Sequence, residues 1–270
     1  MASLQQIQDE HNRYIDSLLE SFERELAAIV NAAALRTQAR LDKAIQLSDG
    51  KVARTLGNTR TLRRLDAIFL EEMDRAGYQH LLDELVSQFP GQLPYFQQTL
   101  ETLSAAMKEP LPVVEFGPRD IHAFAAQAEL SKDGIAAAME SIAARAKNRV
   151  MLSIGGSTLS DLTAAFAGAV SRPMPEVVGL AETATATYYR VIADRGYQIL
   201  DQQTPGKMKY SYEGPLDKLT RPFCSKLLRT HRVFTRAQID QMDNGQIPNV
   251  WISCGGWRCR HQWVLSTGGM

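Results

Sequence analysis

The chain has 270 residues, of which 44% are hydrophobic and 22% charged, a composition that is typical of a globular protein and excludes disorder of the whole chain. Lysine and arginine together number 30, as do aspartate and glutamate, so no global charge attracts the chain to nucleic acid or to a membrane surface. Because there is neither a signal-like start nor an apolar run of about 18 residues, we expect a soluble chain with no membrane partner.

Residues 4–45 are expected to form one long amphipathic helix. Their apolar side chains recur at steps of three and four, at Leu4, Ile7, Tyr14, Leu18, Phe22, Leu26, Ile29, Ala33, Leu35 and Leu41. The apolar stripe is narrow, and the helix exceeds the usual length of a globular helix. Two interpretations stay open: a helix of an intramolecular bundle, or one that docks onto another subunit.

Five cations follow in a segment without acids, residues 50–65: Lys51, Arg54, Arg60, Arg63 and Arg64. Cationic side chains bind nucleic acid by neutralising phosphates and releasing counterions. The segment lacks interleaved aromatic residues, so a solvated loop and helix start is the simpler interpretation. Nucleic-acid contact by these five side chains is the alternative.

Helical periodicity continues through the middle of the chain. Helices are expected over 62–88 and 93–107, with a break at QFPGQLP, and over 120–151 with a stop near SKDG, residues 131–134. Residues 108–120 carry three prolines and a glycine, so they form the expected domain boundary.

Two glycine features follow. The pair Gly155 and Gly156 lacks the lysine of a phosphate-binding loop, so we interpret it as a hinge before a helix capped by Ser157 or Thr158. A further helix is expected from about Pro175 to a C-terminal cap at Gly196.

After Gly196 the pattern changes to short apolar runs separated by turn dipeptides, with cations in excess over acids. One short helix is expected over 235–242, and the runs VWISC and CRHQWVL flank GGWR as in a β-hairpin. The predicted fold is therefore mainly α-helical with a small C-terminal α+β module. The predicted domains are a long-helix docking or oligomerisation region (1–108), a helical middle region (109–196) and the module (197–270).

The hairpin segment collects the most reactive side chains of the chain. Cys254 is expected at the end of its first strand, and Cys259 and His261 on one face of the second. With Cys224 they make a Cys3His set, which binds structural zinc in other proteins. The alternatives are a catalytic thiol beside His261, a disulfide between Cys254 and Cys259, and a buried aromatic core with free thiols. One structural zinc ion is therefore the only cofactor that the sequence suggests.

A second cluster, GPLDKLTRP, holds Asp217, Thr220 and Arg221. An aspartate in a proline-bounded turn accepts backbone N–H groups and pairs with an arginine. We interpret this cluster, together with the glycine pair Gly255 and Gly256 of the hairpin, as structural turns. No catalytic residue is assigned, because no second acid with suitable spacing accompanies Asp217.

Four stretches together, ETATATYYR, YSYEGPLDKLTRPFC, FTRAQIDQMDNGQ and SCGGWRCRHQW, resemble the C-terminal half of the tailed-phage minor head proteins, the head morphogenesis family that includes Mu protein F and the SPP1 portal-associated minor head protein. The resemblance covers residues 180–265. The matching residues are Glu182, Arg190, Asp217, Thr220, Arg221, Cys224, the segment 235–244, Gly255, Gly256, Cys259, Arg260 and His261. Two places depart from the pattern, the stretch Arg229–His231 where a glycine turn is expected and Arg258 in place of asparagine.

Membership of this family implies a virion protein of the head, near the portal vertex, which resides in the host cytoplasm during assembly. The implied partners are the portal protein and other virion proteins, in an oligomeric or multi-copy assembly. The implied role is in head assembly and DNA delivery, without enzymatic activity. Two rival classes remain: a zinc-dependent hydrolase or nuclease, and a nucleic-acid-binding module that uses the basic C-terminal part to contact DNA.

Overall fold

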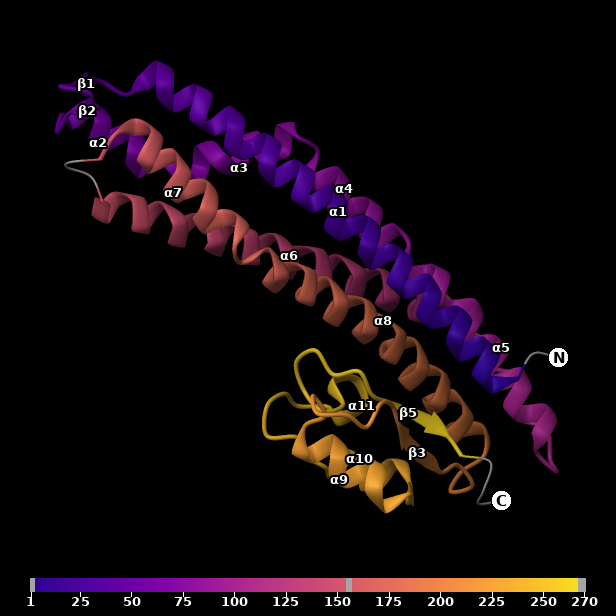
Figure 1. Cartoon of the computed structure of the whole chain (residues 1–270). Coiled ribbons are helices and arrows are strands. Elements are labelled where there is room, and N and C mark those ends of the chain that lie inside the picture. Colours follow the sequence, from indigo (N-terminus) through magenta and orange to yellow (C-terminus); the bar gives the residue numbers. More distant parts are fainter. Residues whose placement is uncertain (1–2, 154–156, 267–270) are drawn as a thin grey trace. The chain divides into compact units, whose positions relative to one another are not determined.

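The computed structural model describes residues 3–153 and 157–266. The fold is mainly α-helical, and a small α+β module follows the last long helix (Figure 1). The predicted fold class is therefore confirmed. The Gly155–Gly156 pair, predicted to be a hinge, lies outside the described residues.

Contacts divide the chain into two units, each assembled from separate segments. Unit 1 comprises Met1–Ser17, Ser87–Leu130 and Glu182–Met270, and unit 2 comprises Leu18–Val86 and Ser131–Ala181. The long helices α1 (Leu4–Ala44), α6 (Pro118–Ser153) and α8 (Met174–Gln203) each contribute to both. The three consecutive domains expected from the sequence stay a prediction.

Unit 2 packs helices around an apolar core. Besides parts of α1, α6 and α8 it contains the strands β1 (Leu47–Ser48) and β2 (Lys51–Val52), followed by α2 (Leu56–Arg63), α3 (Leu65–Arg75), α4 (Tyr78–Ser87) and α7 (Leu159–Ser171). Phe69 of α3 is fully buried, and its ring meets the ring of Phe166 edge-on at 5.3 Å between centroids. Thr158 caps α7 through a capping box with Asp161, which confirms the predicted helix start.

The helical part of unit 1 has an aromatic core. A 3-10 turn, η1 (Phe89–Gln92), leads into α5 (Leu93–Ala106). The ring of Phe96 lies 5.6 Å from that of Tyr197 on α8, and Tyr189 lies near the same ring. This core supports the second half of α8, on which the C-terminal module is built.

The module contains a three-stranded antiparallel sheet and three short helices. In chain order these are β3 (Tyr210–Glu213), α9 (Pro222–Thr230), β4 (Val233–Phe234), α10 (Arg236–Asp240), α11 (Val250–Ser253) and β5 (Gln262–Leu265). The strand order is β4-β3-β5, and Tyr212 of β3 lies opposite Trp263 of β5. Thr235 caps α10 with a capping box, as expected for the predicted short helix.

The hairpin predicted across GGWR is wrong. Residues 250–253 form helix α11 and not a strand, and β5 pairs with β3, which lies about fifty positions earlier in the chain. The backbone reverses at Asn249 and Cys254, which both have positive φ and so end any extended strand there. A pairing between strands so far apart leaves no local signal in the sequence.

Several helix boundaries also differ from the prediction. The helix α6 continues through Ser131–Gly134, where a stop was expected, because one glycine in a long helix costs only about 1 kcal/mol. The helix α8 passes through Gly196 and ends at Gln203. Gly196 is a contact residue and not a cap, since a Cβ there would overlap the ring of Phe96. The stretch predicted as one helix over 62–88 is instead divided among α2, α3 and α4.

Candidate metal centre

Three side chains of the module place their ligand atoms together. Those of Cys224, Cys259 and His261 all lie within 4.8 Å of one another, and the three residues are buried. The two Sγ atoms are 3.7 Å apart, and Cys259 Sγ lies 3.4 Å from His261 Nδ1. Tetrahedral zinc with bonds of about 2.3 Å to sulfur and about 2.0 Å to nitrogen gives ligand separations of about 3.8 and about 3.5 Å. The group therefore has the donors and the spacing to hold a metal ion.

Different elements position the three ligands. Cys224 lies in the first turn of α9, which begins at Pro222 after an extended Arg221. Cys259 and His261 lie in the segment just before β5, not on the strand where they were predicted. A Cβ on Gly255 would overlap the Cys224 sulfur, so only glycine lets the backbone approach the thiols here. The predicted structural role of Gly255 thus has a concrete cause.

Hydrogen bonds orient the imidazole for coordination. The Nε2 atom of His261 lies 2.8 Å from the carbonyl oxygen of Pro215. A carbonyl only accepts, so in the neutral ring Nε2 carries the proton and Nδ1 presents its lone pair to the thiols. Protein-bound metals depend on this kind of outer contact to fix the tautomer of a histidine ligand. Gly214, with φ of +148°, leaves room for the ring, because a Cβ there would collide with it.

The three cysteines are all free and buried but differ in character. Hydrogen bonds from the Cys224 thiol and from the backbone N–H of His261 lower the pKa of Cys259 far below its ordinary value, and the Gly255 N–H also donates to its sulfur at 3.2 Å. The same bond to Cys259 raises the pKa of Cys224. Burial raises the pKa of Cys254 to about 12. Cys254 does not belong to the ligand group, although the sequence placed it there.

Arginines around the centre bind main-chain oxygens. Arg221 donates to the carbonyls of Gly255 and Trp257. Arg190, on α8, donates to the carbonyl of Ile252 at 3.2 Å and to that of Cys259. Both guanidinium groups therefore fix the loop that carries Cys259.

The predicted turn at Asp217 is present, with a different arginine. The Asp217 carboxylate accepts from the Leu219 N–H and from the Thr220 hydroxyl, and it pairs with Arg260 at 2.8 Å and not with Arg221. The hydrogen bond from Arg260 and that from the Leu219 N–H lower the pKa of Asp217 to about 2. The turn is thus tied to the segment that supplies Cys259 and His261.

A cavity of about 260 Å³ adjoins this centre. Its lining includes the three metal-ligand candidates together with Glu182, Leu219, Arg221, Arg258 and Arg260. Arg258 lies 3.6 Å from Glu182 across it. The cavity is therefore basic, with one acid at its wall.

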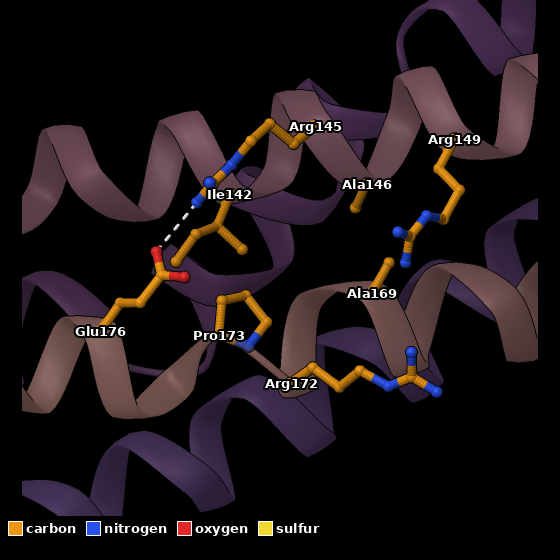
Figure 2. Close-up of a pocket in the computed structure, with 8 residues that line it drawn as sticks. All are labelled: Ile142, Arg145, Ala146, Arg149, Ala169, Arg172, Pro173 and Glu176. Atoms are coloured by element: carbon orange, nitrogen blue, oxygen red, sulfur yellow. Dashed lines mark hydrogen bonds and ion pairs between the residues drawn. The ribbon is translucent and has the colours of Figure 1, made fainter.

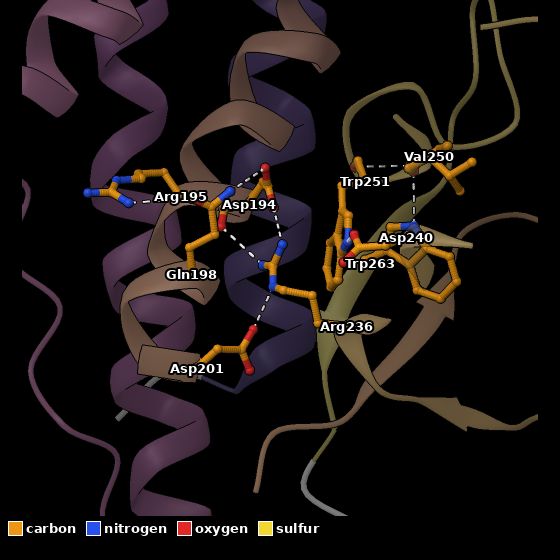
Figure 3. A network of polar contacts seen from close by, with 10 residues as sticks. Asp194, Arg195, Gln198, Asp201, Arg236, Asp240, Val250, Trp251 and Trp263 are labelled. Atoms are coloured by element: carbon orange, nitrogen blue, oxygen red, sulfur yellow. Dashed lines mark hydrogen bonds and ion pairs between the residues drawn. The ribbon is translucent and has the colours of Figure 1, made fainter. Parts of the chain in front are cut away.

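Arg236 joins the module to the second half of α8. Its guanidinium lies between the carboxylates of Asp194 and Asp201, at 2.8 and 2.6 Å, and stands over the ring of Trp251 at 4.0 Å (Figure 3). The Trp251 Nε1 in turn donates to Asp240 at 2.8 Å. The sequence analysis missed Arg236, because its partners lie 35 and 42 positions away and neither flanks it.

A second hollow lies in unit 2. It measures about 330 Å³, and Figure 2 shows Arg145 turned towards Glu176 while Arg149 and Arg172 project to the same side. Arg145 and Glu176 are both about 60% exposed, so their ion pair contributes about 0–1 kcal/mol. This hollow is a basic surface depression rather than an enclosed site.

The five cations predicted for nucleic-acid contact are all exposed. Lys51 lies on β2, Arg60 and Arg63 lie in the last turn of α2, and Arg64 follows that helix. Exposure suits both interpretations of the segment, so nucleic-acid contact stays a prediction.

None of the described helices is long and apolar enough to cross a membrane. Comparisons of the chain with protein-family models, with curated proteins and with solved structures found no match.

Proposed function

We propose that the chain is a minor head protein of a tailed phage, and that one zinc ion bound by Cys224, Cys259 and His261 closes its C-terminal module. One observation carries the proposal. Most residues of the family resemblance outside the segment 235–244 lie at or beside a single centre: Glu182, Arg190, Asp217, Arg221, Cys224, Cys259, Arg260 and His261.

The chemistry of these contacts favours a structural role over catalysis. The guanidinium groups of Arg190 and Arg221 donate hydrogen bonds to main-chain carbonyls. The Asp217 carboxylate is paired with Arg260 and accepts hydrogen bonds within its own turn. A hydrolytic metal site also needs a free general base, and the two acids near this centre, Asp217 and Glu182, are paired with Arg260 and Arg258. Here the polar side chains fix a loop, which is what a rigid assembly module requires.

Zinc suits this donor set. Two thiolates and an imidazole are ligands that structural zinc sites use. The buried environment and the histidine anchored on Pro215 supply the outer contacts that such sites need. Bound zinc would hold α9 and the segment before β5 together, because its ligands come from both.

The partner in the proposal is the portal protein, with α1 as the contacting helix. Leu35 of α1 is 69% exposed, whereas Phe22, Leu26 and Ala33 of the same helix are buried. An exposed leucine on a long helix is a candidate anchor for another subunit.

The test is co-purification of the full chain with the tagged portal protein encoded by the same phage. We expect the two proteins to co-purify, and Leu35→Glu to weaken the association by about tenfold or more. Leu130→Glu is the matched control, since Leu130 is similarly exposed at 66% but lies on α6, and it should leave binding unchanged. A chain that does not bind the portal, and whose loss leaves heads assembled and filled with DNA, would refute the proposal.

A further inference from the structure

A tetrahedral metal ion bound by Cys224, Cys259 and His261 has one position left. Structural zinc sites are almost always four-coordinate, so a further donor is required. The sequence suggested Cys254 for this position, but Cys254 is outside the ligand group. Its thiol instead donates to the carbonyl of Trp251, at 3.8 Å.

The phenol oxygen of Tyr212 lies close to both sulfurs of the ligand group. It is 3.4 Å from Cys224 Sγ and 3.6 Å from Cys259 Sγ. Tetrahedral zinc with a bond of about 2.0 Å to oxygen places a sulfur and an oxygen ligand about 3.5 Å apart. The four distances among these donors, 3.7, 3.4, 3.4 and 3.6 Å, therefore match four of the six edges of one coordination tetrahedron.

The sheet fixes Tyr212 in this place. It lies on the central strand β3, opposite Trp263 of β5, and its ring is stacked on that of His261 with an interplanar angle of 9°. The side chain is 6% exposed. A residue held on a paired strand and between packed rings keeps its oxygen beside the sulfurs without a further ordering cost.

We propose that Tyr212 is the fourth ligand of this metal centre, giving a set of two thiolates, one imidazole and one phenolate. The inference rests on the zinc site proposed above. As the bond from zinc to Oη forms, the phenol O–H bond breaks and its proton leaves to solvent. No electron is transferred, because zinc has no redox chemistry.

The alternative role for Tyr212 is that of a hydrogen-bond donor to the thiolates, with water from the adjoining cavity on the metal. The two roles differ in the state of the phenol. A ligand is ionised by the metal, whereas a donor keeps its proton.

The experiment is a titration of the metal-free full chain with Zn²⁺, and separately with Co²⁺, followed by near-ultraviolet difference absorbance. The ionised-tyrosine signal should appear at one equivalent of metal in the wild-type chain. The variant Tyr212→Phe should lose this signal and bind metal at least about tenfold more weakly. Tyr210→Phe is the matched control, because Tyr210 lies two residues away on the same strand and faces Tyr197 and Trp251; it should behave like the wild type.

The outcomes separate this inference from the proposed function. If the wild-type protein binds one metal ion without an ionised-tyrosine signal, Tyr212 is not a ligand and the zinc site remains intact. The same conclusion follows if Tyr212→Phe binds the metal ion with unchanged affinity. Wild-type protein that binds no metal would overturn both the zinc site and the inference. Circular dichroism checks that the Tyr212→Phe variant is folded. If the variant does not fold, the wild-type absorbance titration still tests the inference.

Discussion

Unit 2 and the C-terminal module bury different kinds of side chain. The core of unit 2 consists mainly of aliphatic and phenyl groups on helices, such as Phe69 against Phe166, with a few polar side chains such as Asn58 and Glu72. The module buries thiols, an imidazole and two indoles, and a guanidinium lies between two carboxylates at its base. An apolar helical core tolerates small shifts, since its attraction is non-directional. The module depends on hydrogen bonds and ion pairs, which weaken when their geometry changes, so it tolerates small shifts less well.

The chain allows the two regions to be followed separately. All three tryptophans, Trp251, Trp257 and Trp263, lie in the module. Tryptophan fluorescence therefore reports the module, whereas far-ultraviolet circular dichroism reports mainly the long helices.

The largest effect is expected in unit 2. Phe69→Ala removes a fully buried ring and should lower the free energy of unfolding by about 3–5 kcal/mol. Denaturant titration followed by circular dichroism measures this change, with a smaller shift in tryptophan fluorescence. Leu56→Ala is the control, because Leu56 is 66% exposed, and it should change stability by less than about 0.5 kcal/mol. Equal shifts in both signals would show that unit 2 and the module unfold together, which would contradict their separate response.

Metal removal should act on the module instead. At free zinc about 100-fold above its dissociation constant, binding stabilises the folded module by about 2.7 kcal/mol, and a chelator should remove this contribution from the fluorescence transition. Cys259→Ser should abolish the response to zinc. Cys254→Ser changes an equally buried thiol that is outside the ligand group, so it should keep the response. A chelator effect that is larger on the helical signal than on fluorescence would contradict the assignment.

The smallest effect concerns the pairing of Asp217 with Arg260. Because the pKa of Asp217 is lowered to about 2 from an ordinary 3.8, the folded state favours the charged form. This contribution is fully present above pH 3.8 and is lost as the pH falls towards about 2. Arg260→Gln should raise the pKa of Asp217, which NMR titration of its carboxyl group measures. Arg258→Gln, which alters a neighbouring arginine paired with Glu182, should leave that titration unchanged.

The two regions also differ in how far the sequence predicted them. The apolar spacing along α1 and the capping residues Thr158 and Thr235 are local signals, and the structure has these features as expected. The pairing of β5 with β3 and the contact of Arg236 with Asp194 join residues more than 40 positions apart. A spacing pattern carries no information about such partners.

The candidate site shows the same limit. Cys259 and His261 lie close together as expected, although they precede the strand on which the sequence placed them. The sequence did not predict that Cys254 lies outside the ligand group, because its position depends on the turn at Cys254, where φ is +50°. Tyr212 gave a weak signal, since it alternates with Tyr210 along the strand, but its approach to two distant sulfurs required the sheet register.

Arg258 combines an unfavourable backbone conformation with a charged contact to α8. Its φ of +54° is a left-handed value that costs a non-glycine residue about 1–2 kcal/mol, and asparagine, the residue that the family resemblance leads one to expect here, bears that cost more easily. The arginine is longer than asparagine, and its guanidinium reaches Glu182 on α8. Both side chains are about half exposed, so this ion pair offsets only about 0–1 kcal/mol of the backbone cost.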